Sequence, residues 1–248
     1  MQKQLVLLHG WGMNREVWDL IEPELSFIFD GEVKALDLPG YGYHQIDKAA
    51  NYTCDLAGMA KKLAEQIQDG SVIAGWSLGG LVALYLAHFY PKKVSKVILI
   101  ASSPFFAHSD DWPGIKLDVL ELFNKQLTEN SAKTIERFLA IQAMGSQSAR
   151  QDIKELRALI GQAPATDSEV LKQGLDILEH HDLRGEFASL SQPIGAIFGR
   201  LDALVPYKAI GKMQQLRPQL NIAVIDKASH APFISHKEEF IAAFKSML

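Results

Sequence analysis

The stretch Gly75-Trp76-Ser77-Leu78-Gly79-Gly80 indicates a sharp turn between a strand and a helix. It follows the short apolar run 72–74, and an apolar segment continues from it to Tyr90. Glycine suits such a turn because a side chain at position 75 or 79 would crowd it. A serine at its centre is held with its hydroxyl clear of the sheet. An ordinary glycine-rich connection is the alternative, so the rest of the chain has to decide between the two.

Short apolar runs alternate with helical patterns on both sides of this turn. Apolar residues recur at helical spacing over 56–67, and Thr53, just before this range, is the expected N-cap. The capping-box pair Ser235 and Glu238 predicts the start of a final helix. Each apolar run is short enough for a buried parallel strand. The runs are 5–8, 33–36, 72–74, 97–100, 194–198 and 222–225. The pattern predicts an α/β fold with a mostly parallel central sheet flanked by helices.

The strand pattern stops after residue 104 and returns only near residue 191. In the interval, apolar residues recur at helical spacing, for example at 135–142 and 153–160. We therefore expect a helical cap inserted into a discontinuous core. The expected boundaries are 1–104 for the first part of the core, 105–190 for the cap and 191–248 for the second part of the core.

Length and composition fit one large domain or a domain with an insertion. The chain has 248 residues, of which 48% are hydrophobic, and its one cysteine, Cys54, allows no internal disulfide. Nothing resembles a Cys/His metal cluster, so we expect no metal, no organic cofactor and a reducing compartment, by default the cytoplasm. A net charge of −4 argues against bulk nucleic-acid binding. No stretch approaches the ~20 apolar residues of a membrane span, and no surface demands an oligomer, so we expect a monomer.

A serine hydroxyl is a good nucleophile at neutral pH only when a base removes its proton and a carboxylate orients that base. Asp202 follows the predicted strand at 194–198, and His230 follows the one at 222–225. The order Ser, Asp, His along the chain is that of the α/β-hydrolase fold, whose sites lie at the carboxyl ends of parallel strands. We predict that Ser77, Asp202 and His230 form a catalytic triad in an α/β-hydrolase fold with an inserted cap.

Acyl transfer also needs donors for the tetrahedral oxyanion. The stretch His9-Gly10-Trp11-Gly12 follows the first predicted strand directly. The expected donors are the backbone N–H groups of Trp11 and Leu78, which leaves their side chains free to line an acyl pocket. Trp76 is also expected at the pocket wall, with simple core packing as the alternative for both tryptophans.

Other polar residues are expected to have structural roles. We expect His9 to shape its loop rather than act as the base, Asp37 to be a turn residue and Cys54 to be structural. A serine at position 77 excludes haloalkane dehalogenases and epoxide hydrolases, which need a carboxylate there. Six histidines lack a strand-end position and are expected on the surface or in packing. They are His44, His88, His108, His180, His181 and His236.

Longer stretches resemble the bacterial pimeloyl-[acyl-carrier protein] methyl ester esterases of biotin synthesis, from about Leu5 to the C-terminus. The core motifs are common to many hydrolases, whereas those in the cap are more specific. The matching stretches are Leu-Leu-His-Gly-Trp-Gly at 7–12, Gly-Trp-Ser-Leu-Gly-Gly-Leu-Val-Ala at 75–83, Ala-Ser-Ser-Pro at 101–104, Trp-Pro-Gly-Ile-Lys at 112–116, Glu-Arg-Phe-Leu-Ala at 136–140, Ala-Arg-Gln-Asp at 149–152 and His-Ala-Pro-Phe-Ile-Ser-His at 230–236.

The resemblance implies a serine carboxylesterase that removes the methyl group from a pimeloyl ester carried by acyl carrier protein and releases methanol. It implies the same triad and oxyanion donors, and it implies that residues 138–142 contact the acyl chain. The expected substrate-binding residues are Trp11, Ser77, Leu78, Phe138, Leu139, Ala140, Ile141, Gln142 and His230.

The segment 131–160 carries a local positive charge. It contains five Lys or Arg and three Asp or Glu, a net charge of +2 in a chain of −4. Helical spacing places Lys133 and Arg137 on one stripe, and Arg150 and Lys154 share a face further on. A solvated helix face is the alternative, but the resemblance implies that these four residues dock the acidic acyl carrier protein.

Two other functions remain open. A general short-chain carboxylesterase, thioesterase or carbon–carbon bond hydrolase would use the same triad, whereas a non-catalytic binding protein on this scaffold would not need one. The chain also departs from the family it resembles, whose members begin with an additional pair of strands, so we expect either a smaller sheet here or a true start that lies upstream. Without that pair, the strand at 33–36 is expected to become a sheet edge that needs polar protection.

Overall fold

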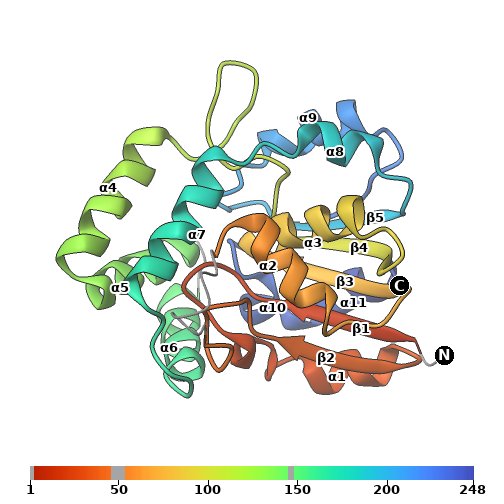
Figure 1. Ribbon diagram of the computed structural model, residues 1–248, viewed down its shortest axis with the longest axis horizontal. Helices are drawn as coiled ribbons and strands as arrows, with labels where there is room; N and C mark the ends of the chain where they lie inside the picture. Colours follow the sequence, from red (N-terminus) through yellow and green to blue (C-terminus); the bar gives the residue numbers. More distant parts are fainter. Residues whose placement is uncertain (1–2, 46–53, 145–147) are drawn as a thin grey trace.

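The computed structural model describes residues 3–45, 54–144 and 148–248 (Figure 1). Its centre is a six-stranded sheet in the order β2-β1-β3-β4-β5-β6, and all neighbouring strands pair in parallel. The predicted α/β class and parallel sheet are confirmed, and each predicted strand is present. The strands are β1 (Gln4–Leu8), β2 (Glu32–Leu36), β3 (Ser71–Trp76), β4 (Val94–Ile100), β5 (Ile194–Gly199) and β6 (Asn221–Ile225).

Helices cover both faces of the sheet. The apolar helix α3 packs on β3 and β4 with α2 beside it, and α1 and α11 contact each other on the opposite face (Figure 1). The helices of the two core parts, with the short 3₁₀ helix η1, are η1 (Arg15–Trp18), α1 (Glu22–Ile28), α2 (Leu56–Ala64), α3 (Leu78–Phe89), α9 (Lys208–Leu216), α10 (Pro232–Ser235) and α11 (Lys237–Lys245).

The described part of the predicted interval without strands contains five helices. They are α4 (Leu117–Glu129), α5 (Ser131–Gln142), α6 (Ala149–Ile160), α7 (Ser168–His180) and α8 (Arg184–Ser189). Helices α4 to α7 lie to one side of the sheet (Figure 1), and both α7 and α8 contact α3. We call residues 105–190 the cap segment, and their division from the core as a separate domain stays a prediction.

The two predicted helix starts need correction. The α2 helix is capped by Asp55, whose carboxylate accepts a hydrogen bond from the Gly58 N–H at 2.7 Å, while Thr53 lies outside the described residues. Ser235 does not cap the last helix, because Pro232 starts the short helix α10 and Ser235 is its last residue. An N-cap needs extended backbone, and a residue in a helical turn cannot supply it. The α11 helix follows His236, which makes no side-chain capping bond.

The strand order determines where a site can form. The chain passes from β1 to its neighbour β2 and from β3 to its neighbour β4, so the connections after these two adjacent strands run in opposite directions across the sheet. Ligand sites in open parallel sheets lie at such a switch point, beyond the carboxyl ends of the strands. Within the described part of the chain, β2 is an edge strand as predicted, and Glu32 and Lys34 give it polar side chains.

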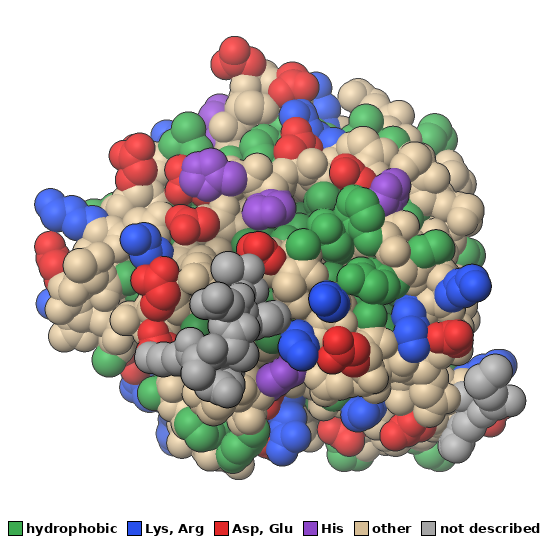
Figure 2. Space-filling model, in the orientation of Figure 1, with side chains coloured by type: hydrophobic (Ala, Val, Ile, Leu, Met, Phe, Trp, Pro, Cys, Tyr) green, Lys and Arg blue, Asp and Glu red, His purple; other side chains and the backbone are tan. Residues whose placement is uncertain are grey.

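The face seen in Figure 2 carries interspersed acidic and basic side chains, and hydrophobic side chains gather over α3. Phe89, at the end of α3, is 50% exposed and its ring lies 4.2 Å from that of Tyr85. No helix in the described ranges is long and apolar enough to span a membrane.

Candidate active site

Ser77 lies between β3 and α3 in a strained backbone conformation. Its φ is 55° and its ψ is −119°, a region that residues other than glycine rarely adopt. A Cβ atom at Gly79 would lie 2.5 Å from the carbonyl oxygen of Leu8, and one at Gly75 would collide with the carbonyl of Gly79. Both positions therefore require glycine, and the predicted sharp strand-to-helix turn is confirmed.

Hydrogen bonds from β4 and the residues after it hold this turn. The Ser77 N–H donates to the carbonyl of Ile100 at 3.0 Å, and the Ser77 carbonyl accepts from the Ser102 hydroxyl at 2.8 Å and from the Gly80 N–H at 2.9 Å. Because the main chain at Ser77 is bonded on both sides, the position of its side chain is set by the backbone.

Asp202 and His230 form a buried pair behind the turn. The Asp202 Oδ2 atom lies 2.8 Å from Nδ1 of His230, and Asp202 Oδ1 accepts from the N–H groups of Leu204 and Val205 at 2.8 and 2.9 Å. A carboxylate only accepts, so Nδ1 is the donor and Nε2 of His230 is left with its lone pair. Among the described residues Nε2 has no hydrogen-bond partner, so the Ser77 hydroxyl does not bond to it here, and the contact between Ser77 and His230 in the predicted triad stays a prediction.

Trp76 supports the backbone of His230. Its indole Nε1 donates to the His230 carbonyl at 2.8 Å, and its ring lies 4.9 Å from that of Phe233 and 6.5 Å from that of Trp18. The residue is fully buried. These contacts favour core packing, the alternative considered for Trp76, over the expected role as a pocket wall.

The predicted oxyanion loop lies against Ser77. A Cβ atom at Gly10 would be only 3.2 Å from the Cβ of Ser77. Leu78 is the first residue of α3, so its N–H has no carbonyl in the preceding turn of the helix. In the described ranges no acceptor is found for the backbone N–H of Trp11 or of Leu78. Both groups thus stay candidates for binding an oxyanion.

His9 maintains the shape of this loop. Its Nε2 accepts from the Leu38 N–H at 3.0 Å, so Nδ1 is the donor to the carbonyl of Gly10 at 2.8 Å. Burial lowers the pKa of His9 to about 4, although the Gly10 hydrogen bond and the carboxylate of Asp37 oppose this shift. Asp37 in turn accepts from the backbone of Arg15 and Tyr43. The contacts support the expected loop and turn roles of both residues.

The expected acyl-binding residues lie on α5, but not all on one side. Phe138, Leu139 and Gln142 are buried, Ile141 is half-buried, and Ala140 is exposed. The Phe138 ring lies 4.7 Å from that of Trp11, and the Gln142 carbonyl accepts from the His230 N–H at 3.1 Å. The structure therefore brings the start and the end of this stretch to the candidate site. Ala140 lies on the exposed side.

The four basic residues expected to dock a carrier are exposed on α5 and α6. They are Lys133, Arg137, Arg150 and Lys154. The fifth cation of this segment, Arg157, forms an ion pair with Glu136 and so joins the two helices.

The remaining candidates are in structural settings. Cys54 is buried, and burial, with smaller effects of nearby carboxylates, raises its pKa to about 12, so it is a poor nucleophile. His9 and His230 are the two buried histidines of this chain. Across the described residues, no group of three or more His, Cys, Asp or Glu side chains could hold a metal ion.

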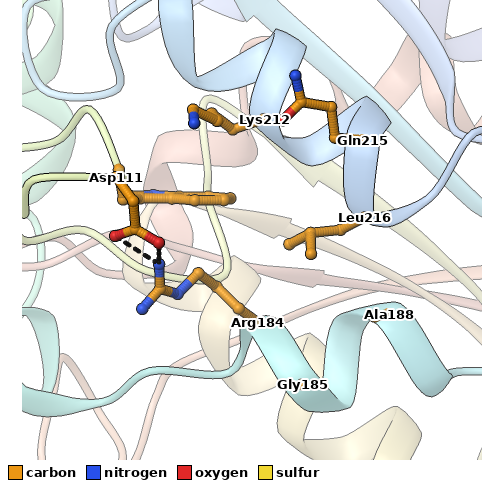
Figure 3. A pocket seen from close by; sticks show the side chains of 8 residues that line it. Asp111, Arg184, Gly185, Ala188, Lys212, Gln215 and Leu216 are labelled. Atoms are coloured by element: carbon orange, nitrogen blue, oxygen red, sulfur yellow. Dashed lines mark hydrogen bonds and ion pairs between the residues drawn. The ribbon is translucent and has the colours of Figure 1, made fainter.

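A pocket of about 410 Å³ lies between the cap segment and α9 and includes no predicted site residue (Figure 3). Arg184 forms one side of it, with its guanidinium paired to Asp111 and Asp182 and placed 5.3 Å from the ring centre of Trp112. The pocket is lined by Asp111, Trp112, Arg184, Gly185, Ala188, Lys212, Gln215 and Leu216.

Two residues that no sequence pattern indicated tie the site to the cap segment. The Ser229 hydroxyl donates to the carbonyl of Met144 at 3.0 Å, and the Asn14 side-chain amide donates to the carbonyl of Ile160 at 3.0 Å. No sequence signal marks either contact, because every residue carries a carbonyl that could accept.

The parallel sheet, the strained serine turn and the buried Asp–His pair are those of a serine hydrolase of the α/β class. Residues 3–237 match the family model described as alpha/beta hydrolase fold, and the chain belongs to this family. Curated relatives narrow the assignment of this chain to the family of pimeloyl-[acyl-carrier protein] methyl ester esterases. The relative of that name from Pseudoalteromonas atlantica is 48% identical over 95% of this chain and 90% of its own length. The one from Klebsiella pneumoniae strain 342 is 44% identical over 98% of this chain and 94% of its own length.

Solved structures agree on the fold. The esterase EaEST from Exiguobacterium antarcticum superposes with a TM-score of 0.85 at 24% identity, covering 98% of this chain and 91% of that one. A bromoperoxidase from Bacillus anthracis gives the same TM-score at 21% identity, covering 100% and 92%. At these identities the likeness concerns the fold and not the substrate.

Proposed function

We propose that this protein is a serine carboxylesterase that hydrolyses the methyl ester of a pimeloyl group carried by acyl carrier protein, releasing methanol in biotin synthesis. The observation that carries the proposal is the buried Asp202–His230 pair beside the strained Ser77 turn, in a chain 44–48% identical to esterases with this name. Cytoplasmic location and a monomeric state are part of the same proposal.

In the proposed mechanism the Ser77 hydroxyl attacks the ester carbonyl while Nε2 of His230 takes its proton. Asp202 keeps the ring oriented and stabilises its charged form. The N–H groups of Trp11 and Leu78 bind the oxyanion. His230 then protonates the departing methoxide, which leaves as methanol. Water activated by His230 hydrolyses the acyl-enzyme and leaves a free carboxylate on the carrier-bound chain.

The carrier is proposed to dock on the exposed faces of α5 and α6. Lys133 and Arg137 lie on α5, and Arg150 and Lys154 lie on α6, within a segment whose net charge is opposite to that of the whole chain. Acyl carrier proteins are acidic, so complementary charge would steer the encounter and orient the carrier.

The function is tested by complementation of a biotin auxotroph that lacks this esterase, with the wild type and Ser77→Ala compared at equal expression. We expect growth without biotin for the wild type only. Methanol release from the carrier-linked methyl ester should be measured beside hydrolysis of short nitrophenyl esters. A wild type that cleaves the nitrophenyl esters but neither complements nor releases methanol would instead be a general carboxylesterase.

A further inference from the structure

Two hydrogen bonds join the loop that carries His230 to the end of α5. The backbone N–H of His230 donates to the Gln142 carbonyl at 3.1 Å, and the hydroxyl of the preceding residue, Ser229, donates to the Met144 carbonyl at 3.0 Å. Both donors belong to the segment between β6 and α10, and both acceptors belong to the cap segment.

Two residues in and just after the oxyanion loop make similar bonds to the cap segment. The Asn14 side-chain amide, just after the loop 9–12, donates to the carbonyl of Ile160 at 3.0 Å. Trp11 Nε1 donates to the carbonyl of Leu171, in α7, at 2.7 Å. The His230 loop and the oxyanion loop are therefore each held by donors that reach into the cap segment.

The positions of two of the acceptors, Gln142 and Ile160, explain part of this pattern. The last four carbonyls of a helix have no partner within the helix and must be satisfied from outside. Gln142 ends α5, Met144 follows two residues later, and Ile160 ends α6. The bonds to Gln142 and Ile160 thus satisfy the C-terminal ends of the two helices whose exposed faces carry the four docking cations, while Met144 lies just beyond α5 and Leu171 lies in the first turn of α7.

We propose that Ser229 is a positioning residue that couples the carrier-docking face of α5 to His230. Its hydroxyl holds the His230 loop to the end of α5, so a carrier bound to Lys133 and Arg137 steadies the helix that keeps Nε2 of His230 in place. The proposal takes the docking face from the function proposed above. A misplacement of about 1 Å in a catalytic group is enough to slow a reaction by on the order of 100-fold.

The test compares the wild type with Ser229→Ala, with Ser229→Thr, which keeps the hydroxyl, and with Ser246→Ala. Ser246 is an exposed serine that also donates to a carbonyl, that of Ala243, and it serves as the matched control. We expect Ser229→Ala to lower kcat for the carrier-linked ester about tenfold with KM unchanged. A tenfold loss corresponds to ~1.4 kcal/mol in activation free energy. Ser229→Thr should recover most of kcat, and Ser246→Ala should equal the wild type.

Coupling between carrier docking and His230 is measured as a change in the rate at which a serine-directed phosphonate labels the protein. The rate is compared with and without carrier protein that lacks its prosthetic arm. We expect the carrier to accelerate labelling of the wild type and not of Ser229→Ala. Unchanged kcat in a folded Ser229→Ala, or equal acceleration in both proteins, would overturn the proposal. So would a carrier that has no effect on the wild type.

The two proposals can fail separately. If the wild type does not hydrolyse the carrier-linked ester, the proposed function fails, while the effect of Ser229→Ala on labelling without carrier still tests positioning. Thermal unfolding of each sample shows whether the variant is folded, and Ser229→Cys, of similar size, replaces Ser229→Ala if it is not.

Discussion

The Nδ1 atom of His230 lies 2.8 Å from Oδ2 of Asp202, and both side chains are fully excluded from solvent. The other carboxylate oxygen is held by two backbone N–H groups of residues 204 and 205. Because Asp202 is bonded on both oxygens, it fixes both the orientation and the tautomer of His230. That leaves Nε2 as the nitrogen available for proton transfer.

Asp202→Asn should keep the fold and lose activity. An amide can present an N–H to Nδ1, which favours the tautomer with its proton on Nε2, the wrong nitrogen for a base. We expect kcat to fall about 10³- to 10⁴-fold, as the loss of the carboxylate in such triads does. Methanol release and a circular dichroism spectrum check the prediction, and a variant with more than a tenth of wild-type kcat would remove Asp202 from the proposed triad.

Ser77→Ala should abolish both turnover and phosphonate labelling, because the other hydroxyl at the turn, that of Ser102, already donates to the carbonyl of residue 77. The free energy of unfolding should change little, since alanine tolerates the positive φ of this position about as poorly as serine does. Mass spectrometry of the labelled protein provides the measurement, and Ser246→Ala is again the control. Labelling of Ser77→Ala at the wild-type rate would contradict the proposed nucleophile.

Charge reversal of Arg137 and Arg150 to Glu should reduce kcat/KM for the carrier-linked ester on the order of tenfold or more, and the loss should shrink at high salt. A small soluble methyl ester should be hydrolysed at the wild-type rate, because both residues are exposed on the outer side of their helices. Lys61→Glu, an exposed reversal on α2, is the matched control. Equal losses on the carrier-linked and the small ester would argue against docking at these residues.

His9 should make the protein less stable as the pH falls. Its pKa is lowered from 6.5 to about 4 by burial, so between these values the unfolded chain binds a proton that the folded protein does not. The free energy of unfolding therefore declines from pH 6.5 towards pH 4, by on the order of 3 kcal/mol for this group, and levels off below. Urea unfolding of His9→Asn should show a smaller decline over this range.

The exposed His108 supplies the control for that experiment. His108→Asn removes a surface imidazole and is the matched substitution with which the decline of His9→Asn is compared. A His9→Asn variant that declines as steeply as the wild type would mean that other groups cause the acid sensitivity.

Gly79→Ala should destabilise the protein by several kcal/mol or prevent folding, because the new Cβ would lie 2.5 Å from the backbone oxygen of Leu8. Gly185 in α8 is the matched control, since a Cβ there has no neighbour within 4 Å. Alanine at 185 should stabilise the protein by about 0.5–1 kcal/mol. Urea unfolding of both variants measures the difference, and a Gly79→Ala protein as stable as the wild type would contradict the packing of the turn.

The sequence by itself determined the α/β class, the parallel strands and the turn at Ser77. These features depend on local steric demands and on short-range patterns of apolar residues, which can be recognised without knowing the fold. It also determined which acid and which histidine meet, because parallel strands in one sheet bring their carboxyl ends to the same edge. The cap helices at 135–142 and 153–160 were predictable from their spacing for the same reason.

Only the tertiary structure decided how the cap segment is joined to the site. The contact between Ser229 and Met144 spans 85 residues of sequence, and that between Asn14 and Ile160 spans 146. Any carbonyl can accept such a bond, so residue type carries no information about the partner. The predicted start of the last helix was wrong for a related reason. Ser235 and Glu238 match a capping box, but Pro232 starts the short helix α10 one turn earlier. Local patterns show which groups need partners, and packing decides which partners they find.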